Sequence, residues 1–358
     1  METDVMPAAA RRRLIEAMPK AELHLHLDGS LRIDTALELA RTRNVDAPRD
    51  WAGMYDALVA PQRGADQAEL LRAFDLPIAL MQDAEALERT AFELVEAKAA
   101  DKVRYVEIRW GPLLHTRGGL SLEDGIAAVC AGARAGARAG LEVRLICTAL
   151  RSHDPADNAV LAEVAADFQD RGLTGFDLAG PEQAYPDPLL HREAFAIARD
   201  VGLQITIHAG EWGGADQVRR ALEVDPARIA HGPGAIDDPE LCRQLIDRRI
   251  TLDLCPTSNV QAGIVASLSD HPLTRLHRLG VPVTLSTDDS TVSDVSLSDE
   301  YARAIDSSGL TLPELWSVNR HALVVAFADV STLAALRQEF DDWASGIAEL
   351  GTSAASVR

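Results

Sequence analysis

Cysteine and long apolar runs are both scarce in this sequence of 358 residues. No segment approaches the roughly 18 apolar residues of a membrane span, and the N-terminal stretch METDVMPAAARRRLIEAMPK lacks the apolar core of a signal peptide. The four cysteines form no C-x-x-C pair and lie in apolar stretches, so we expect buried, reduced thiols, at positions 130, 147, 242 and 255. Reduced thiols are typical of a reducing compartment. These absences predict a cytoplasmic protein with no membrane partner.

Positive charge is also in short supply. Lysine and arginine number 35 against 55 aspartates and glutamates, which gives a formal net charge of −20. Beyond the short run at 11–13, no basic cluster offsets this excess. The phosphates of a nucleic acid or an anionic membrane would be repelled. The composition therefore argues against a nucleic-acid partner and favours a small neutral or cationic ligand.

Eight short β-rich runs recur along the chain, separated by long stretches rich in Ala, Leu, Glu and Arg with helical spacing. The runs cover residues 21–26, 103–109, 143–149, 175–179, 204–208, 228–231, 251–255 and 283–287. Strands that alternate with helices pair in parallel. Eight such units over this length predict an α/β fold, the (β/α)8 TIM barrel. No linker or break in composition interrupts them, so residues 1–358 are predicted to form a single domain.

The connection after the first strand, residues 31–100, is too long for one helix. We expect extra helices inserted here, over 34–43, 67–83 and 84–100. Residues 70–76 (LLRAFDL) are equally consistent with a lid over the barrel mouth and with an ordinary amphipathic packing helix.

Unusual polar residues fall at the ends of several predicted strands. The first strand ends in His24-Leu25-His26-Leu27-Asp28. Side chains alternate between the faces of a strand, so His24 and His26 point the same way, and so does Asp28 where the strand continues to it. Two imidazoles directed into a barrel are costly unless they bind a ligand or form hydrogen bonds. The H-x-H pair therefore favours a metal site over an ordinary core position.

Three later strands end in similar groups. His208 ends the fifth strand and is followed by Glu211, His231 ends the sixth, and Asp288 and Asp289 follow the eighth. The chemistry of a TIM barrel takes place at these strand ends. Three histidines and one aspartate suit zinc, which lowers the pKa of a bound water to about 7, although iron, cobalt and manganese also accept such ligands. Glu211, His231 and one of the two aspartates remain to move protons.

These strand ends carry motifs by which the chain resembles the adenosine deaminase family over nearly its whole length. The family belongs to the metal-dependent amidohydrolases, and its adenosine and AMP deaminase branch has this set of motifs in this order. The matching stretches are KAELHLHLDGS (20–30), FDL (74–76), YVEIR (105–109), DLAGPE (177–182), HAGE (208–211), IAHG (229–232), CPTSN (255–259) and STDD (286–289).

The resemblance implies a hydrolytic deaminase of adenosine or deoxyadenosine, which releases ammonia and inosine or deoxyinosine in purine salvage. It implies one Zn²⁺ per chain, with the ligands His24, His26, His208 and Asp288. Glu211 would protonate ring nitrogen N1 and so make C6 electrophilic. His231 would orient or deprotonate the attacking water.

The resemblance also implies contacts with the purine nucleoside, the expected partner. Asp289 would hydrogen-bond to N7, and the backbone N–H of Gly180 would reach N3. Asp28 would meet the ribose hydroxyls, and His26 would lie beside the substrate as well as the metal. The oligomeric state is open, because periodicity alone identifies no interface.

Two departures from the family pattern leave the substrate open. Pro181 stands where the family often has Asp, and Ser290 where it often has Pro. Both positions lie beside the expected base pocket. Another 6-aminopurine, such as adenine, aminodeoxyfutalosine or N6-substituted AMP, is therefore an alternative, although Thr287 and Asp28 favour the nucleoside.

Two further alternatives concern the class of protein. A non-catalytic purine-binding relative is disfavoured because all seven catalytic and ligand positions are present. A dinuclear amidohydrolase is disfavoured because the fourth strand, GFDLAG, has no lysine to bridge two metals.

The remaining histidines fall in predicted loops or helices and are assigned no role in the site: His115, His153, His191, His271, His277 and His321. In the CPTSN segment, the hydroxyl-bearing residues fit a pocket wall and a simple turn equally well.

Overall fold

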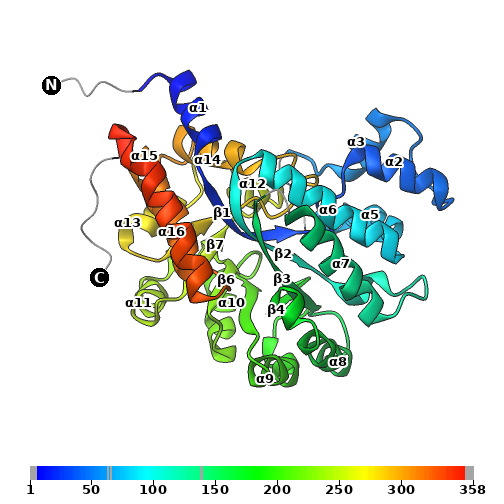
Figure 1. The fold of residues 1–358 in the computed structure, drawn as a ribbon. Coiled ribbons are helices and arrows are strands. Elements are labelled where there is room, and N and C mark those ends of the chain that lie inside the picture. Colours follow the sequence, from blue (N-terminus) through cyan, green and yellow to red (C-terminus); the bar gives the residue numbers. More distant parts are fainter. Residues whose placement is uncertain (1–5, 63, 65–66, 138–139, 351–358) are drawn as a thin grey trace.

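The computed structural model describes residues 6–62, 64, 67–137 and 140–350, and its centre is a barrel of parallel strands in the order β1 to β8 (Figure 1). The strands are β1 (Lys20–His26), β2 (Val103–Trp110), β3 (Glu142–Leu150), β4 (Leu173–Ala179), β5 (Gln204–Ala209), β6 (Arg228–His231), β7 (Thr251–Leu254) and β8 (Val283–Leu285). Backbone hydrogen bonds close the barrel between its first and last strands. The N–H of His26 donates to Asp288 O at 2.7 Å, and the N–H of Asp288 donates to His24 O at 3.1 Å. The predicted TIM barrel is confirmed.

Extra helices follow β1, as predicted, and they lie to one side of the barrel in Figure 1. They are α2 (Ile33–Thr42), α3 (Trp51–Leu58), α4 (Gln67–Arg72), α5 (Asp75–Leu80) and α6 (Ala84–Ala100). The expected single helix over 67–83 is wrong, because it is divided into α4 and α5. Pro77 explains the break, since a proline ring clashes with the carbonyl four residues earlier and carries no N–H.

The other helices are α1 (Ala8–Ala17), α7 (Leu122–Gly136), α8 (Pro155–Ala166), α9 (Arg192–Asp200), α10 (Gly214–Ala221), α11 (Pro239–Arg248), α12 (Pro256–Gln261), α13 (Leu273–Leu279), α14 (Leu297–Asp306), α15 (Leu312–Val325) and α16 (Val330–Ser345). Most of these helices cover the outside of the barrel, whereas α12 is buried beside the strand ends. All four cysteines are buried free thiols, as predicted. In the ranges that the structure describes, no helix is long and apolar enough to span a membrane.

The barrel interior is polar as well as apolar near the N-terminal ends of the strands. Arg228, the first residue of β6, forms ion pairs with Glu107 of β2 and with Asp253 of β7, and all three side chains are fully buried. We call these three residues the lower layer. Arg228 also donates to Val325 O at 2.7 Å, and Asp253 accepts the hydroxyl of Thr284 at 2.7 Å. The buried charges of this layer are therefore paired with one another.

Candidate active site

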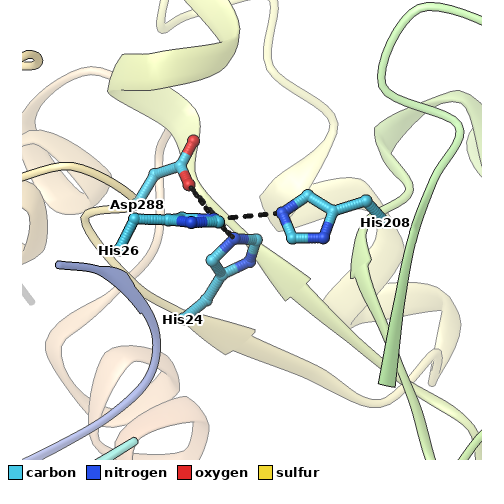
Figure 2. Close-up of side chains that lie close together, drawn as sticks. All are labelled: His24, His26, His208 and Asp288. Atoms are coloured by element: carbon cyan, nitrogen blue, oxygen red, sulfur yellow. Dashed lines mark hydrogen bonds and ion pairs between the residues drawn. The ribbon is translucent and has the colours of Figure 1, made fainter. Parts of the chain in front are cut away.

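Four potential metal ligands meet at the opposite, C-terminal ends of the strands. Figure 2 shows His24 and His26 from β1, His208 from β5 and Asp288 after β8 pointing toward one another. The Nε2 atom of His26 lies 3.2 Å from His24 Nε2 and 3.1 Å from His208 Nε2. The Oδ1 atom of Asp288 lies 3.1 Å from His24 Nε2. One ligand atom from each of the four lies within 4.8 Å of all the others, so the sequence-predicted set is brought together.

The protonation of these ligands suits a metal ion. Burial holds the pKa of His24 well below its ordinary value and lowers the pKa of His26 to about 4, so both rings are neutral near pH 7. His208 Nδ1 lies 3.0 Å from a carboxylate oxygen of Asp177, to which it donates. The lone pair of His208 Nε2 therefore faces His24 and His26. Such an outer carboxylate commonly orients a metal-binding imidazole.

The turn after β8 holds Asp288 in an unusual conformation. Its φ of +66° lies in the left-handed region, which non-glycine residues rarely adopt. The preceding Thr287 is anchored through its N–H and hydroxyl to Glu22, at 3.0 and 2.5 Å. Lys98 of α6 forms a buried ion pair with Glu22 at 2.8 Å. Ser258 donates to Asp288 Oδ2 at 2.7 Å, so backbone and carboxylate are both fixed.

Glu211 and His231 lie beside the four ligands. The loop that carries Glu211 is held by Glu182, which accepts the backbone N–H groups of Gly210 and Trp212 at 2.6 and 3.0 Å. Burial raises the pKa of Glu211 well above its ordinary value, and the negative charges of Asp288 and Glu182 raise it further. Burial also lowers the pKa of His231 to about 3. Glu211 Oε1 lies 3.8 Å from His231 Nε2. The pair thus combines a protonated acid with a neutral imidazole.

Asp28 has a partner that sequence reasoning missed. His115 Nε2 lies 2.5 Å from Asp28 Oδ1, and the N–H of Gly111 donates to Asp28 Oδ2 at 3.0 Å. His115 Nδ1 donates to Met81 O at 2.8 Å, at the end of α5. His115 is buried in a short 3-10 turn after β2 rather than exposed. Its position shortly after the end of a strand is the one sequence signal that could have identified His115 as a site residue.

The comparisons with known proteins agree with this geometry. The adenosine deaminase family profile matches residues 19–343. The chain belongs to the adenosine deaminase family. An adenosine deaminase of Mycobacterium ulcerans is 40% identical over 333 residues, which cover 87% of this chain and 91% of that protein.

Solved structures of related proteins support the same family. A Burkholderia ambifaria amidohydrolase with bound Zn superposes with a TM-score of 0.86 at 27% identity, covering 96% of each chain. The Arabidopsis thaliana N6-methyl-AMP deaminase superposes with a TM-score of 0.82 at 30% identity, covering 94% of this chain and 99% of that one. This adenosine deaminase family member is therefore a hydrolytic deaminase with a metal cofactor.

Asp289 of this family member is buried beside Gly29. In the described part of the chain its Oδ1 atom is buried without a hydrogen-bond partner. Burial and the charges of Asp288 and Asp28 raise its pKa well above the ordinary value. A Cβ atom on Gly29 would lie 1.8 Å from Asp289 Oδ1, so only glycine fits there. Gly180 follows β4 directly, with a φ of +103°.

The FDL motif shared with the family lies at the barrel mouth. A small apolar cluster contains Ala60, Leu70, Ala262 and Val292, and Phe74 and Trp212 pack against it. Ala262, Val292 and Trp212 lie in segments that follow β7, β8 and β5. Residues 70–76 therefore cover the loops around the site, which is the location expected of a lid. Their movement stays a prediction.

The CPTSN segment has a more specific role than either a pocket wall or a turn. Its last three residues lie in the first turn of α12, which begins at Pro256, and each bonds to another buried side chain. Thr257 donates to Glu300, Ser258 donates to Asp288, and Asn259 Nδ2 lies 3.2 Å from His231 Nδ1. The segment thus supports site residues from behind.

Proposed function

We propose that this enzyme hydrolyses the 6-amino group of adenosine or deoxyadenosine, giving inosine or deoxyinosine and ammonia. The observation that carries the proposal is Glu211, a buried acid with a raised pKa, beside the cluster of three histidines and Asp288. A 6-aminopurine needs a proton on its ring before water can add at C6. A carboxyl that is neutral near pH 7 can donate that proton.

One Zn²⁺ per chain is the proposed metal. Three imidazoles and a carboxylate are its preferred ligand types, and their separations fit a single ion. When bound, zinc supplies a water molecule made acidic enough to react at neutral pH. His24, His26, His208 and Asp288 would hold it, and Asp177 would keep His208 oriented.

The remaining residues bind and orient the purine. Glu211 donates to N1, and His231 contacts the attacking water. Asp289 has a raised pKa, so its neutral carboxyl can donate to N7, which is an acceptor. Its unpartnered Oδ1 atom leaves it free for this contact. Gly180 offers its backbone N–H to N3.

Asp28 would accept a ribose hydroxyl, with His26 beside it. Each carboxylate oxygen of Asp28 has a second lone pair beyond its bond to His115 or Gly111. A carboxylate at this position favours a hydroxyl over a phosphate, and the net charge of −20 acts in the same direction. Adenine, aminodeoxyfutalosine and N6-substituted AMP are the alternative substrates, the last because the Arabidopsis relative is an N6-methyl-AMP deaminase.

The test is ammonia release from adenosine, deoxyadenosine, adenine, aminodeoxyfutalosine and N6-methyl-AMP, with and without prior treatment with a chelator. We expect efficient turnover of the two nucleosides and loss of turnover after metal removal, restored by zinc. Turnover of another purine but of neither nucleoside would overturn the proposal that adenosine or deoxyadenosine is the substrate. Turnover that persists after complete metal removal would overturn the proposed zinc dependence.

A further inference from the structure

A chain of buried hydrogen bonds reaches His231 from the side away from the metal ligands. The N–H of Leu273, at the start of α13, donates to His271 Nδ1 at 3.2 Å. His271 Nε2 lies 3.1 Å from Asn259 Oδ1, and Asn259 Nδ2 lies 3.2 Å from His231 Nδ1. At most 3% of the surface of His271, Asn259 or His231 is exposed. We call this chain the His231 relay.

The direction of every bond in the relay follows from its first donor. A backbone N–H can only donate, so His271 Nδ1 accepts from Leu273 and carries no proton. His271 Nε2 must then carry the ring proton and donate to the carbonyl oxygen of Asn259. This contact orients the Asn259 amide, whose NH₂ group therefore faces His231. The amide donates to His231 Nδ1, which accepts through its lone pair.

We propose that Asn259 and His271 are positioning residues that fix His231 in the tautomer with its proton on Nε2. The tautomer itself follows from hydrogen-bond geometry, whereas its consequence for catalysis rests on the proposed function. His231 Nε2 is the nitrogen that faces the site, 3.8 Å from both Glu211 Oε1 and Asp288 Oδ2. The site is therefore offered an N–H donor.

This tautomer selects between the two roles implied for His231. A neutral ring with Nε2–H donates a hydrogen bond to the attacking water and so orients it. It has no lone pair at Nε2 to accept the proton of that water. His231 is thus assigned the role of orienting the attacking water. Asn259 contacts His231 directly, at 3.2 Å, and His271 acts on it through Asn259.

A second asparagine and histidine pair in the barrel provides a matched control. Asn158 Nδ2 lies 3.0 Å from His191 Nδ1, and both residues are buried. Asn158 also donates to Leu150 O at 2.9 Å. Both pairs have the same two side chains in the same contact. His191, however, lies in a 3-10 turn before α9, and among the described residues its side chain bonds to Asn158 and to no residue of the site.

The first experiment is nitrogen NMR of the full-length protein with ¹⁵N-labelled histidine, as purified and after metal removal. Protonated and unprotonated ring nitrogens have well-separated shifts, and the His231→Gln variant identifies the signals of His231. We expect a proton on Nε2 and none on Nδ1. A proton on Nδ1 in the wild type would overturn the relay, whatever the enzyme turns over.

Substitutions then test the two positioning residues. In Asn259→Asp, the carboxylate accepts from His231, so Nδ1 must become protonated, and we expect kcat for adenosine to fall roughly 100-fold. His271→Leu frees the Asn259 amide to rotate, and both tautomers should appear. His271→Gln should retain the wild-type tautomer and most of kcat, because its amide can accept from Leu273 and donate to Asn259.

The control variant Asn158→Asp should leave the His231 signals and kcat unchanged. If Asn259→Asp also leaves Nδ1 of His231 unprotonated, or if His271→Gln and His271→Leu behave alike, the relay is refuted. If the NMR results hold but no purine is deaminated by the wild type, the proposed function fails while the tautomer assignment stands.

Discussion

The two ends of the barrel interior bury polar side chains in different ways. In the lower layer, Arg228 lies between Glu107 and Asp253, and the cation is matched by two carboxylates. At the upper end, the Nε2 atoms of His24, His26 and His208 face one another instead of protein donors. Within the described ranges, Asp289 Oδ1 there has no partner at all.

This difference separates stability from function. A buried polar group without a partner is costly, so such a group beside a candidate site suggests that a ligand supplies the partner. The lower layer is complete without a ligand and holds the strands together. At the upper end, the buried polar groups gain their remaining partners only when a metal ion and a substrate bind. The predictions below test this contrast, and the largest expected effect comes first.

Glu211→Gln tests the chemistry of the upper end most directly. The amide keeps the shape of the acid but cannot deliver its proton to N1, so we expect kcat to fall by about 10³- to 10⁴-fold. Metal content, measured by mass spectrometry, should be unchanged, because Glu211 is not among the four ligands. Normal turnover would refute the proton-donor role.

Arg228→Met tests the lower layer. It leaves Glu107 and Asp253 buried without their cation, and we expect urea unfolding to show a loss of about 3–5 kcal/mol. The KM for adenosine should not change. Arg320→Met is the control, since Arg320 pairs with Asp341 on the surface and its loss should cost only about 0–1 kcal/mol. Equal losses in the two variants would contradict the contrast between buried and exposed pairs.

Glu300, another buried carboxyl, is expected to make the stability of the folded chain depend on pH. Burial raises its pKa to about 7 from 4.5, although Thr257 donates to it. Below pH 4.5 the Glu300 carboxyl is protonated in both the folded and the unfolded chain, and its contribution to the free energy of unfolding is fully present. As pH rises through 7 that contribution is lost, because the unfolded chain releases the proton first. Urea unfolding at pH 5 and pH 8 should therefore show a loss of about 2–3 kcal/mol that Glu300→Gln abolishes.

The control for Glu300 is Glu314. Its hydrogen bond to Arg278 lowers its pKa to about 2. Its contribution to stability is therefore lost only as the pH falls below 4.5, the ordinary pKa of a glutamate. Glu314→Gln should therefore leave the difference between pH 5 and pH 8 as it is in the wild type. A wild type whose stability does not decline over this interval would show that Glu300 is ionised in the folded chain.

The smallest expected effect concerns the ribose contact. Two PLLH turns end in buried histidines, His115 and His191, but only His115 bonds to Asp28. In His115→Ala we expect KM for adenosine to rise about tenfold with kcat nearly unchanged, because a charge-assisted bond that orients Asp28 is lost. His191→Ala should leave both constants as they are. A KM that does not move in His115→Ala would separate His115 from substrate binding.

The sequence predicts the metal cluster well because local rules decide it. The period of two places His24 and His26 on one face, and the strand ends of a barrel meet at one side, which brings His208 and Asp288 to them. The roles assigned to Glu211, His231, Asp289, Asp28 and Gly180 stay predictions until they are tested.

What the sequence did not predict depends on tertiary contacts. Asn259 of α12 and His271, which precedes α13, meet beside His231 at the end of β6, and no spacing in the chain indicates such a bond. His115 likewise finds Asp28 across 87 residues. The prediction of one helix over 67–83 is wrong for a local reason instead. The prediction followed the apolar pattern of this segment and gave too little weight to Pro77, which interrupts a helix.

The hydrogen bonds between His24, His26 and Asp288 that close the barrel have a consequence for biosynthesis. They join the first strand to Asp288, more than 260 residues later in the sequence, and three of the four proposed ligands take part in these bonds. The set of four proposed ligands is therefore complete only after Asp288, the last of them in the sequence, has been synthesised and has paired with the first strand.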